Sequence, residues 1–272
     1  MTEERILVTV KTYPTLDPDY DETVCTAGFR EDGSWVRIYP IPFRKLDYKS
    51  RYSKYQWIKL NLKRNRSDPR PESFKPVNYE KIGLGNRIGT ERAWARRKEI
   101  VLKKIYTNIS RLIEEAKDKN VCTSLAVFKP KKILDFKIEK DRRDWDPKKL
   151  AFLKAKAAQA NLFAKSDNPF EVVAKVPYKF SYEFVDDQNT RSTLMIIDWE
   201  IGQLYWNCLK RNRNDETKTC KDVKKKYFDD FAKTKDLFLF LGTTRLHHFQ
   251  GPNPFIIVGT FHPPKVHQEE LF

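Results

Sequence analysis

The sequence predicts an α+β fold, with sheets in both halves of the chain and helices grouped between them. Three observations support this: apolar and polar residues alternate over the first eighty residues, a helical period follows residue 90, and alternation returns near residue 172. A chain of 272 residues can bury a core without disulfides or metals. We expect a β-rich domain over residues 1–82, a helical middle with a short β segment over 83–165, and an α+β domain over 166–272.

The first domain contains four segments with the alternating or β-branched and aromatic pattern of strands, at residues 5–11, 22–29, 34–41 and 55–63. The tight-turn sequence EDGS separates the second segment from the third. These features predict a small antiparallel sheet or barrel. The proline-rich segment 67–76 is expected on the surface. The glycine-rich segment 83–89 precedes a predicted helix, and we interpret it as a flexible connector, with phosphate contact as the alternative.

The middle domain begins with one long amphipathic helix, predicted over residues 91–118 with Thr90 as its N-cap. Apolar residues recur there at three- and four-residue steps, at Val101, Ile105, Ile109, Leu112 and Ala116. Strand-like segments follow at residues 122–128 and 131–140. Asp146 and Pro147 then form a helix start signal, which predicts a helix up to residue 165.

The last domain returns to strands at residues 177–184 and 192–198, followed by helices at 198–212 and 220–233. Two apolar strands at 235–242 and 253–261 close the chain, joined by the loop TTRLHHFQGP. This order predicts a mixed sheet with helices.

Charge and cysteine content limit the class of partner. Lys and Arg total 53 against 37 Asp and Glu, a formal net charge of +16, which favours a polyanionic partner such as DNA or RNA. The apolar runs are all shorter than the roughly 18 residues of a membrane span. Four scattered cysteines without CxxC spacing fit a reducing compartment. We therefore expect a soluble cytoplasmic protein that binds nucleic acid without a cofactor, with a protein partner as a further possibility.

The segment 32–57 alternates aromatic and basic residues and is the predicted binding surface. Aromatic rings stack on unpaired bases, while basic side chains contact phosphates. Further basic residues follow this segment and begin the predicted helix at 91–118. The predicted nucleic-acid-binding residues are Trp35, Arg37, Tyr39, Arg44, Arg51, Tyr52, Tyr55, Lys63, Arg64, Arg66, Arg96 and Arg97. The alternative is that some of these aromatic residues fill a core and the charged residues face water.

The N-terminal forty residues combine a strand, a CxAG element and a GxWxR element, formed by Cys25, Ala27, Gly28, Gly33, Trp35 and Arg37. In this they resemble the opening of bacterial dual-OB domains, which are paired oligonucleotide-binding barrels. The resemblance implies an OB-like five-stranded barrel with nucleic acid as its ligand, and it implies no catalytic residue.

The sequence leaves two other functions open. Asp198 and Glu200 lie where a buried strand meets a helix, and such a pair can hold Mg²⁺ for phosphodiester cleavage in a metal-dependent nuclease. The same residues also fit an N-cap and a first-turn acid. His247 and His248 can bind metal or contact phosphate, or can simply pack within their loop. A protein-interaction module is the remaining alternative.

Overall fold

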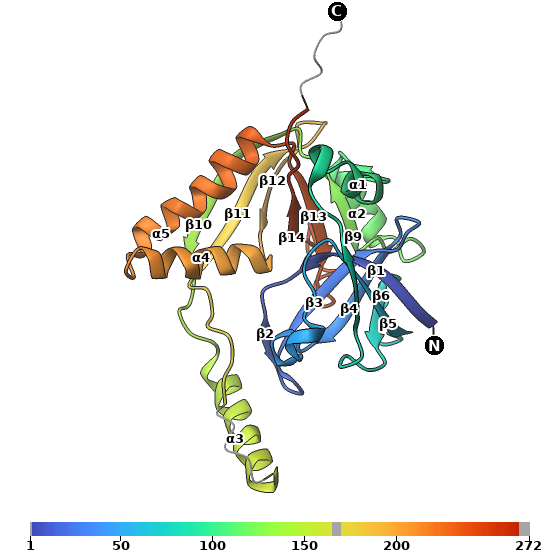
Figure 1. Cartoon of the computed structure of the whole chain (residues 1–272). Helices are drawn as coiled ribbons and strands as arrows, with labels where there is room; N and C mark the ends of the chain where they lie inside the picture. The colour runs from blue at the N-terminus through green and yellow to red at the C-terminus, as the bar shows by residue number, and fades with distance from the viewer. Residues whose placement is uncertain (1, 165–169, 267–272) are drawn as a thin grey trace, which may run out of the picture.

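The computed structural model describes residues 2–164 and 170–266 (Figure 1). Its fold class is the predicted one: a β-barrel at the N-terminus, helices in the middle of the chain, and mixed sheets with helices at the C-terminus. In the described parts of the chain, every helix is too short or too polar to span a bilayer.

Five strands of the N-terminal region form a closed barrel, which is compatible with an OB-like fold. They pair in the order β1, β3, β4, β6, β5, and β5 returns to β1. All neighbours are antiparallel except β4 and β6, which are parallel. The barrel strands are β1 (Thr2–Lys11), β3 (Asp21–Phe29), β4 (Trp35–Ile41), β5 (Gln56–Arg64) and β6 (Ser73–Pro76).

Alternation along the strands fills the barrel interior. Ile58, Leu60 and Leu62 of β5 are buried, whereas Lys59 and Asn61 between them are exposed. The interior core also contains residues from the other strands, among them Ile6, Val8, Val24, Val36 and Ile38. A short strand, β2 (Thr15–Asp17), pairs with β3, and two 3₁₀ turns, Phe43–Lys45 and Tyr48–Ser50, connect β4 to β5.

The glycine-rich segment that was predicted to be a flexible connector is instead a strand. Most of it forms β7 (Gly83–Arg87), which pairs antiparallel with β5 and is exposed along its length. The prediction was wrong because backbone pairing with β5 orders a segment that has few side chains to bury.

Gly28 is required where β3 approaches β1. A Cβ atom at this position would overlap the carbonyl oxygen of Leu7. We therefore expect Gly28→Ala to lower the free energy of unfolding by about 1–3 kcal/mol, because the two strands must move apart. Urea unfolding would measure the change. Gly83→Ala is the matched control, since a Cβ there meets only ordinary contacts; an equal loss in both variants would contradict this explanation.

The long helix predicted over 91–118 is two helices separated by a strand. They are α1 (Glu91–Val101) and α2 (Ile109–Lys117), with β8 (Ile105–Tyr106) between them. Ile105 was assigned to the apolar helix face, but it lies in β8, which pairs parallel with β9 (Leu125–Phe128), and it is 41% exposed. Pairing with a distant strand therefore overrides the local helical period. Thr90 precedes α1 without a side-chain cap hydrogen bond, whereas Asn108 caps α2.

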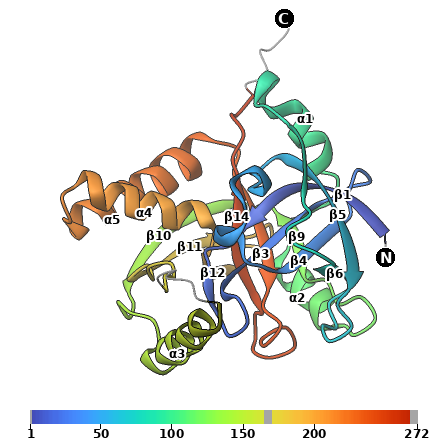
Figure 2. The same cartoon turned by 60° about the horizontal axis from the view of Figure 1, so that its bottom comes forward.

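Two sheets form the C-terminal half. One contains β10 (Lys132–Lys140), β11 (Tyr178–Val185) and β12 (Arg191–Met195) in that order; the other contains β14 (Phe255–Phe261), β13 (Phe238–Thr243), β9 and β8. The helices α4 (Trp199–Arg211) and α5 (Glu216–Lys224) lie beside β10 and β11, and α5 continues into a π-helical segment, Lys225–Ala232 (Figures 1 and 2). Tyr205 and Tyr227 pack with Phe136 and Tyr182 in the core of this half.

The helix α3 (Pro147–Ala164) extends away from the sheets (Figure 1). Its predicted start is confirmed, because the Asp146 side chain accepts hydrogen bonds from the N–H groups of Lys148 and Lys149. Lys156 donates to the carbonyl oxygen of Pro18 at 2.6 Å. The helix is thereby tied to the turn between β2 and β3.

Candidate functional site

An apolar layer joins the outside of the barrel to the C-terminal half. In this layer the barrel strands β1 and β3 face β9, β13 and β14 of the second sheet. Its buried members include Val10, Ala27, Phe29, Leu125, Val127, Phe240, Val258 and Phe261. One outer surface of the barrel is therefore covered by the rest of the chain and is not open to solvent.

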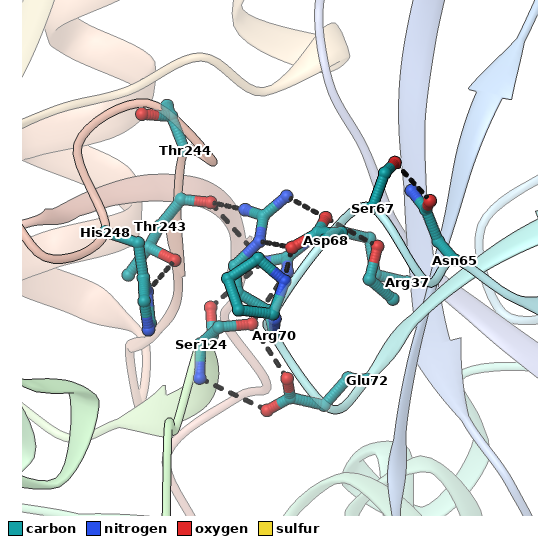
Figure 3. Close-up of polar contacts among 12 residues, drawn as sticks. Arg37, Asn65, Ser67, Asp68, Arg70, Glu72, Ser124, Thr243, Thr244 and His248 are labelled. Atoms are coloured by element: carbon teal, nitrogen blue, oxygen red, sulfur yellow. Dashed lines mark hydrogen bonds and ion pairs between the residues drawn. The ribbon is translucent and has the colours of Figure 1, made fainter. Parts of the chain in front are cut away.

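Arg37 on β4 crosses this junction and is only 3% exposed. Its guanidinium donates to Ser124 Oγ at 2.7 Å and to the Ser124 carbonyl oxygen at 3.0 Å (Figure 3). Ser124 in turn donates to the Glu72 carboxylate from its hydroxyl, at 2.8 Å, and from its backbone N–H, at 3.2 Å. Burial lowers the pKa of Arg37, with the positive charge of Arg70 adding to the effect.

Arg70 forms the second part of the network, from the loop between β5 and β6. Its Nε and Nη2 atoms donate to the two Asp68 oxygens at 2.8 and 2.6 Å, and Nη1 donates to the carbonyl oxygen of Thr243 (Figure 3). Burial raises the pKa of Asp68, but hydrogen bonds from Arg70 and Ser73 outweigh burial and hold that pKa well below its usual value. Two buried arginines are thus balanced by two carboxylates, those of Asp68 and Glu72.

A cleft of about 710 Å³ opens beside this network, between the barrel and the C-terminal sheets. Its walls are mostly apolar, and they include Val10 and Ala27 from the barrel and Leu125, Ile256 and Val258 from the sheet. This volume lies in the range of small-molecule sites, which is roughly 300–1,000 Å³. The junction therefore combines a rigid polar network with an open apolar cavity.

Three basic side chains that line the cleft are exposed or half-buried. Arg245 is exposed and makes no hydrogen bond or ion pair with the residues that the structure describes. Lys175 contacts Asp141 at 2.7 Å, and Lys179 lies 3.9 Å from the same carboxylate. The lining is thus mostly apolar, and its exposed charged residues, Lys179 and Arg245, are both cations; these two residues are here called the rim.

The predicted stacking platform on β4 has the expected alternation, since Val36 and Ile38 are buried in the barrel. Its exposure was predicted wrongly. Trp35 packs on Phe29, with ring centroids 3.9 Å apart, and Arg37 is buried at the junction. Tyr39 is 37% exposed and lines the cleft. Trp35 and Arg37 are covered because Phe240 and Ser124 of the C-terminal half pack against them.

The predicted clamp residues Tyr52 and Tyr55 are core residues, with exposed fractions of 2% and 6%. Tyr52 packs on Phe43 inside the barrel and shares a hydrogen bond with Thr26. The Arg97 guanidinium lies 3.9 Å from the centroid of the Tyr55 ring. The alternative that some of these aromatic residues fill a core is therefore correct for this pair. They are unavailable for stacking on bases.

Some of the predicted basic residues are bonded to other groups of the protein, and others are exposed without an ion pair. Arg44 pairs with Glu22 at 3.0 Å, and Arg51 donates to the carbonyl oxygens of Leu46 and Arg44. Residues Arg64 and Arg97 also donate to backbone carbonyls, and Arg97 is buried, contrary to prediction. The side chains that are exposed and have no ion pair with described residues are Lys63, Arg66 and Arg96.

Asp198 and Glu200 are engaged by a lysine. Asp198 is fully buried, caps α4, and accepts two hydrogen bonds from Lys54 Nζ, each of 3.0 Å; Glu200 contacts the same ammonium group. Burial lowers the pKa of Lys54, but the two carboxylates outweigh burial and raise it. Burial also lowers the pKa of nearby Lys11 to about 8. The N-cap interpretation is confirmed for Asp198. A cation already occupies the position that Mg²⁺ would need.

The histidine pair separates into one exposed and one buried residue. His247 is exposed, whereas His248 is fully buried between Thr243, 2.8 Å from Nδ1, and the thiol of Cys122, 3.1 Å from Nε2. Burial lowers the pKa of His248 and raises that of Cys122. This environment favours the neutral thiol and imidazole over the ion pair that a cysteine nucleophile needs.

Within residues 2–164 and 170–266, no three His, Cys, Asp or Glu side chains form a group that could hold a metal.

Comparison with protein families divides the chain at this junction. Residues 106–272 match the model of a domain of unknown function, DUF8757, which covers more than half of the chain. The chain belongs to the DUF8757 family. Residues 2–103 match a second domain of unknown function, DUF8758. None of the curated proteins matches the chain. The Arg37 and Arg70 network and the cleft thus lie between the two matched segments.

Sequence reasoning missed the residues that build this junction. Asp68, Arg70 and Glu72 fall in a proline-rich loop that was predicted only as surface, and Ser124 and Thr243 have no distinctive sequence context. The motif DPRPE does offer one signal, because closely spaced opposite charges between prolines can form a rigid ion-paired turn. The partners of this loop elsewhere in the chain are 173 residues away for Arg70 and Thr243 and 52 residues away for Glu72 and Ser124, so local pattern cannot identify them.

Proposed function

We propose that the protein binds nucleic acid, with an outer surface of the barrel as its phosphate-contacting surface. This surface, here called the basic barrel face, consists of Arg5, Lys59, Lys63 and Lys75. The pairing register places Arg5 opposite Lys59 and Lys63 opposite Lys75. Paired residues point to the same side of a sheet, and so do Lys59 and Lys63, which are four residues apart on one strand. The four side chains therefore share one surface.

The like-charge pair of Lys63 and Lys75 is the observation that carries the proposal. Like charges directly opposite each other destabilise a sheet. Lys59, Lys63 and Lys75 have no ion pair with any described residue, whereas Arg5 contacts Glu31. The acid Glu3 also lies on this side of β1, opposite Asn61. A bound polyanion would remove the repulsion between the two lysines.

Aromatic side chains adjoin the same lysines. Lys63 and Lys75 line a hollow of about 390 Å³ together with Tyr20 and Tyr79. The two tyrosine rings meet edge to face, with centroids 5.8 Å apart. Stacking of a base on an aromatic ring contributes about 1–3 kcal/mol, so this hollow combines the two interactions that single-strand binding uses.

The test is salt-dependent binding of labelled single-stranded and duplex DNA and RNA, measured by fluorescence anisotropy. For single strands, we expect the slope of log K against log salt to change by about 0.7 for each phosphate contact removed. Lys63→Gln with Lys75→Gln should therefore weaken binding and flatten the slope by about 1.4.

Lys221→Gln with Lys225→Gln is the matched control, because it removes the same charge from exposed positions on the helical side of the molecule, away from the barrel (Figure 1). This control should retain the wild-type slope. Equal losses in the two double variants would reduce the effect to net charge, and the absence of salt-sensitive binding to all four polymers would overturn the proposal.

A further inference from the structure

We infer that the cleft between the barrel and the C-terminal sheets accepts one unpaired base of a bound nucleic-acid strand. This inference rests on the proposed function and adds a second, chemically distinct site to it. The cleft has a volume of about 710 Å³, which is large enough for a nucleotide, and its interior is apolar. A flat base with its ribose fits such a cavity better than a phosphate does, because burial of an unpaired charge is costly.

The aromatic residues of the cleft are held in place by their own polar atoms. Trp145 Nε1 donates to the carbonyl oxygen of Val173 at 2.7 Å. Tyr13 donates to the carbonyl oxygen of Ala174, also at 2.7 Å, and Tyr178 donates to Glu216 at 2.8 Å. These rings lose little conformational freedom when a base packs against them, so they form preorganised walls.

The charges of the cleft fit a base inside and a phosphate outside. The buried guanidinium groups of Arg37 and Arg70 are already bonded to protein acceptors and balanced by Asp68 and Glu72. They offer no net positive charge for a buried phosphate. At the rim, Arg245 is open and exposed. A strand whose base enters the cleft would therefore leave its phosphate beside Arg245.

The loop that carries Arg245 supports a strand rather than a small free molecule as the occupant. It connects β13 to β14 and exposes two large apolar side chains, Leu246 at 69%, which lines the cleft, and Phe249 at 43%, three residues further along the same loop. Exposed apolar groups beside a cationic rim match the alternating bases and phosphates of a strand that continues past the cleft. A free mononucleotide would leave both groups in water.

A strand of twelve nucleotides with 2-aminopurine at one central position tests the inference, because the emission of this base reports its stacking environment. Two cleft variants are used: Trp145→Ala, which removes a wall, and Met195→Trp, which fills the cavity. We expect wild-type protein to change the emission at saturation, and both variants to suppress that change and weaken binding by about tenfold. The salt slope should stay the same, since no phosphate contact is removed.

Tyr48→Ala is the matched control, since it removes an aromatic ring that is 90% exposed and outside the cleft. It should behave as wild type. The double variant of Lys63 and Lys75 should flatten the salt slope and retain the emission change at saturation.

Circular dichroism and unfolding curves would confirm that the cleft variants are folded. A third variant, Arg245→Gln, leaves the cavity intact and should weaken binding by removing the proposed phosphate contact of Arg245.

The outcomes separate this inference from the proposed function. Salt-sensitive strand binding with no emission change, or with an emission change that survives in both cleft variants, overturns the cleft inference alone. Adenosine monophosphate is the second probe. Its binding to the wild type but not to Met195→Trp, without any strand binding, overturns both proposals and makes a free nucleotide the occupant. Binding of neither probe also overturns both.

Discussion

Replacing Arg70 by methionine is expected to lower the free energy of unfolding by about 3–5 kcal/mol, because removing one member of a buried ion pair leaves the other charge uncompensated. Asp68 is 3% exposed and takes two hydrogen bonds from the Arg70 guanidinium. The variant also removes the hydrogen bond from Arg70 to the carbonyl oxygen of Thr243, which joins the loop to β13, and leaves only the 3.5 Å contact from Arg37 there. Urea unfolding at neutral pH would measure the loss.

The pH dependence of this loss identifies its cause. In the wild type the pKa of Asp68 is lowered on folding, so its ion pair contributes stability above the unfolded pKa, near 4, and this contribution is lost as the pH falls below that value. In Arg70→Met the buried carboxyl favours its protonated form. The difference between the two proteins should therefore begin to shrink above about pH 4, where the raised pKa of the variant's carboxyl lies, and should go on shrinking as the pH falls further. Arg66→Met, in the same loop but exposed, should change stability by less than about 0.5 kcal/mol. A loss that is independent of pH would indicate a packing defect instead.

Replacing Lys54 by methionine is expected to cost about 3–5 kcal/mol for the same reason. The lysine side chain is 8% exposed, and its ammonium group holds the fully buried carboxylate of Asp198. Burial and the Glu200 carboxylate raise the pKa of Asp198 against the opposing charge of Lys54, so removing that cation should raise this pKa further. A carboxyl whose pKa is raised on folding stabilises the folded variant at low pH, and this stabilisation is lost as the pH rises through the raised pKa. The stability cost of Lys54→Met should therefore be smaller in acid.

Adding Asp198→Asn to Lys54→Met tests this explanation. The amide keeps an oxygen that can cap α4 but carries no charge, so the double variant should recover part of the lost stability. Lys49→Met, at an exposed position of the same connection, is the control and should be nearly neutral. If the double variant is less stable than Lys54→Met, the unpaired carboxylate is not the cause.

Local pattern predicted the secondary structure wherever burial alternates regularly. The strands β1, β3, β4 and β5 and the helices α3, α4 and α5 follow from period and cap signals in the sequence. Prediction failed between residues 83 and 118, where the helix propensity of the sequence competes with pairing to distant strands. There β7 pairs with β5, and β8 with β9. Such pairings depend on residues far away in the chain, which a local period does not record.

The predicted binding residues show the same limit at the level of side chains. The alternation on β4 correctly separates Trp35, Arg37 and Tyr39 from the barrel interior. It does not show whether the outward face that carries these three residues is covered by another part of the chain. Because the C-terminal half docks there, Arg37 becomes a buried link. Lys63 was predicted as a phosphate contact and is exposed, since its side of β5 remains uncovered. Its partner Lys75 was not selected, because their pairing is set by the register of two strands.

The α+β class, the interior residues of the barrel and the large positive charge follow from composition and from periods of two or four residues. Which part of the outer barrel surface is buried, which cations are neutralised and where a cleft opens depend on contacts between distant parts of the chain. An outward side chain of a barrel is equally suited to water or to an apolar layer supplied from elsewhere in the chain. The docked position of residues 106–272 settles that choice, and no segment of the sequence specifies it alone.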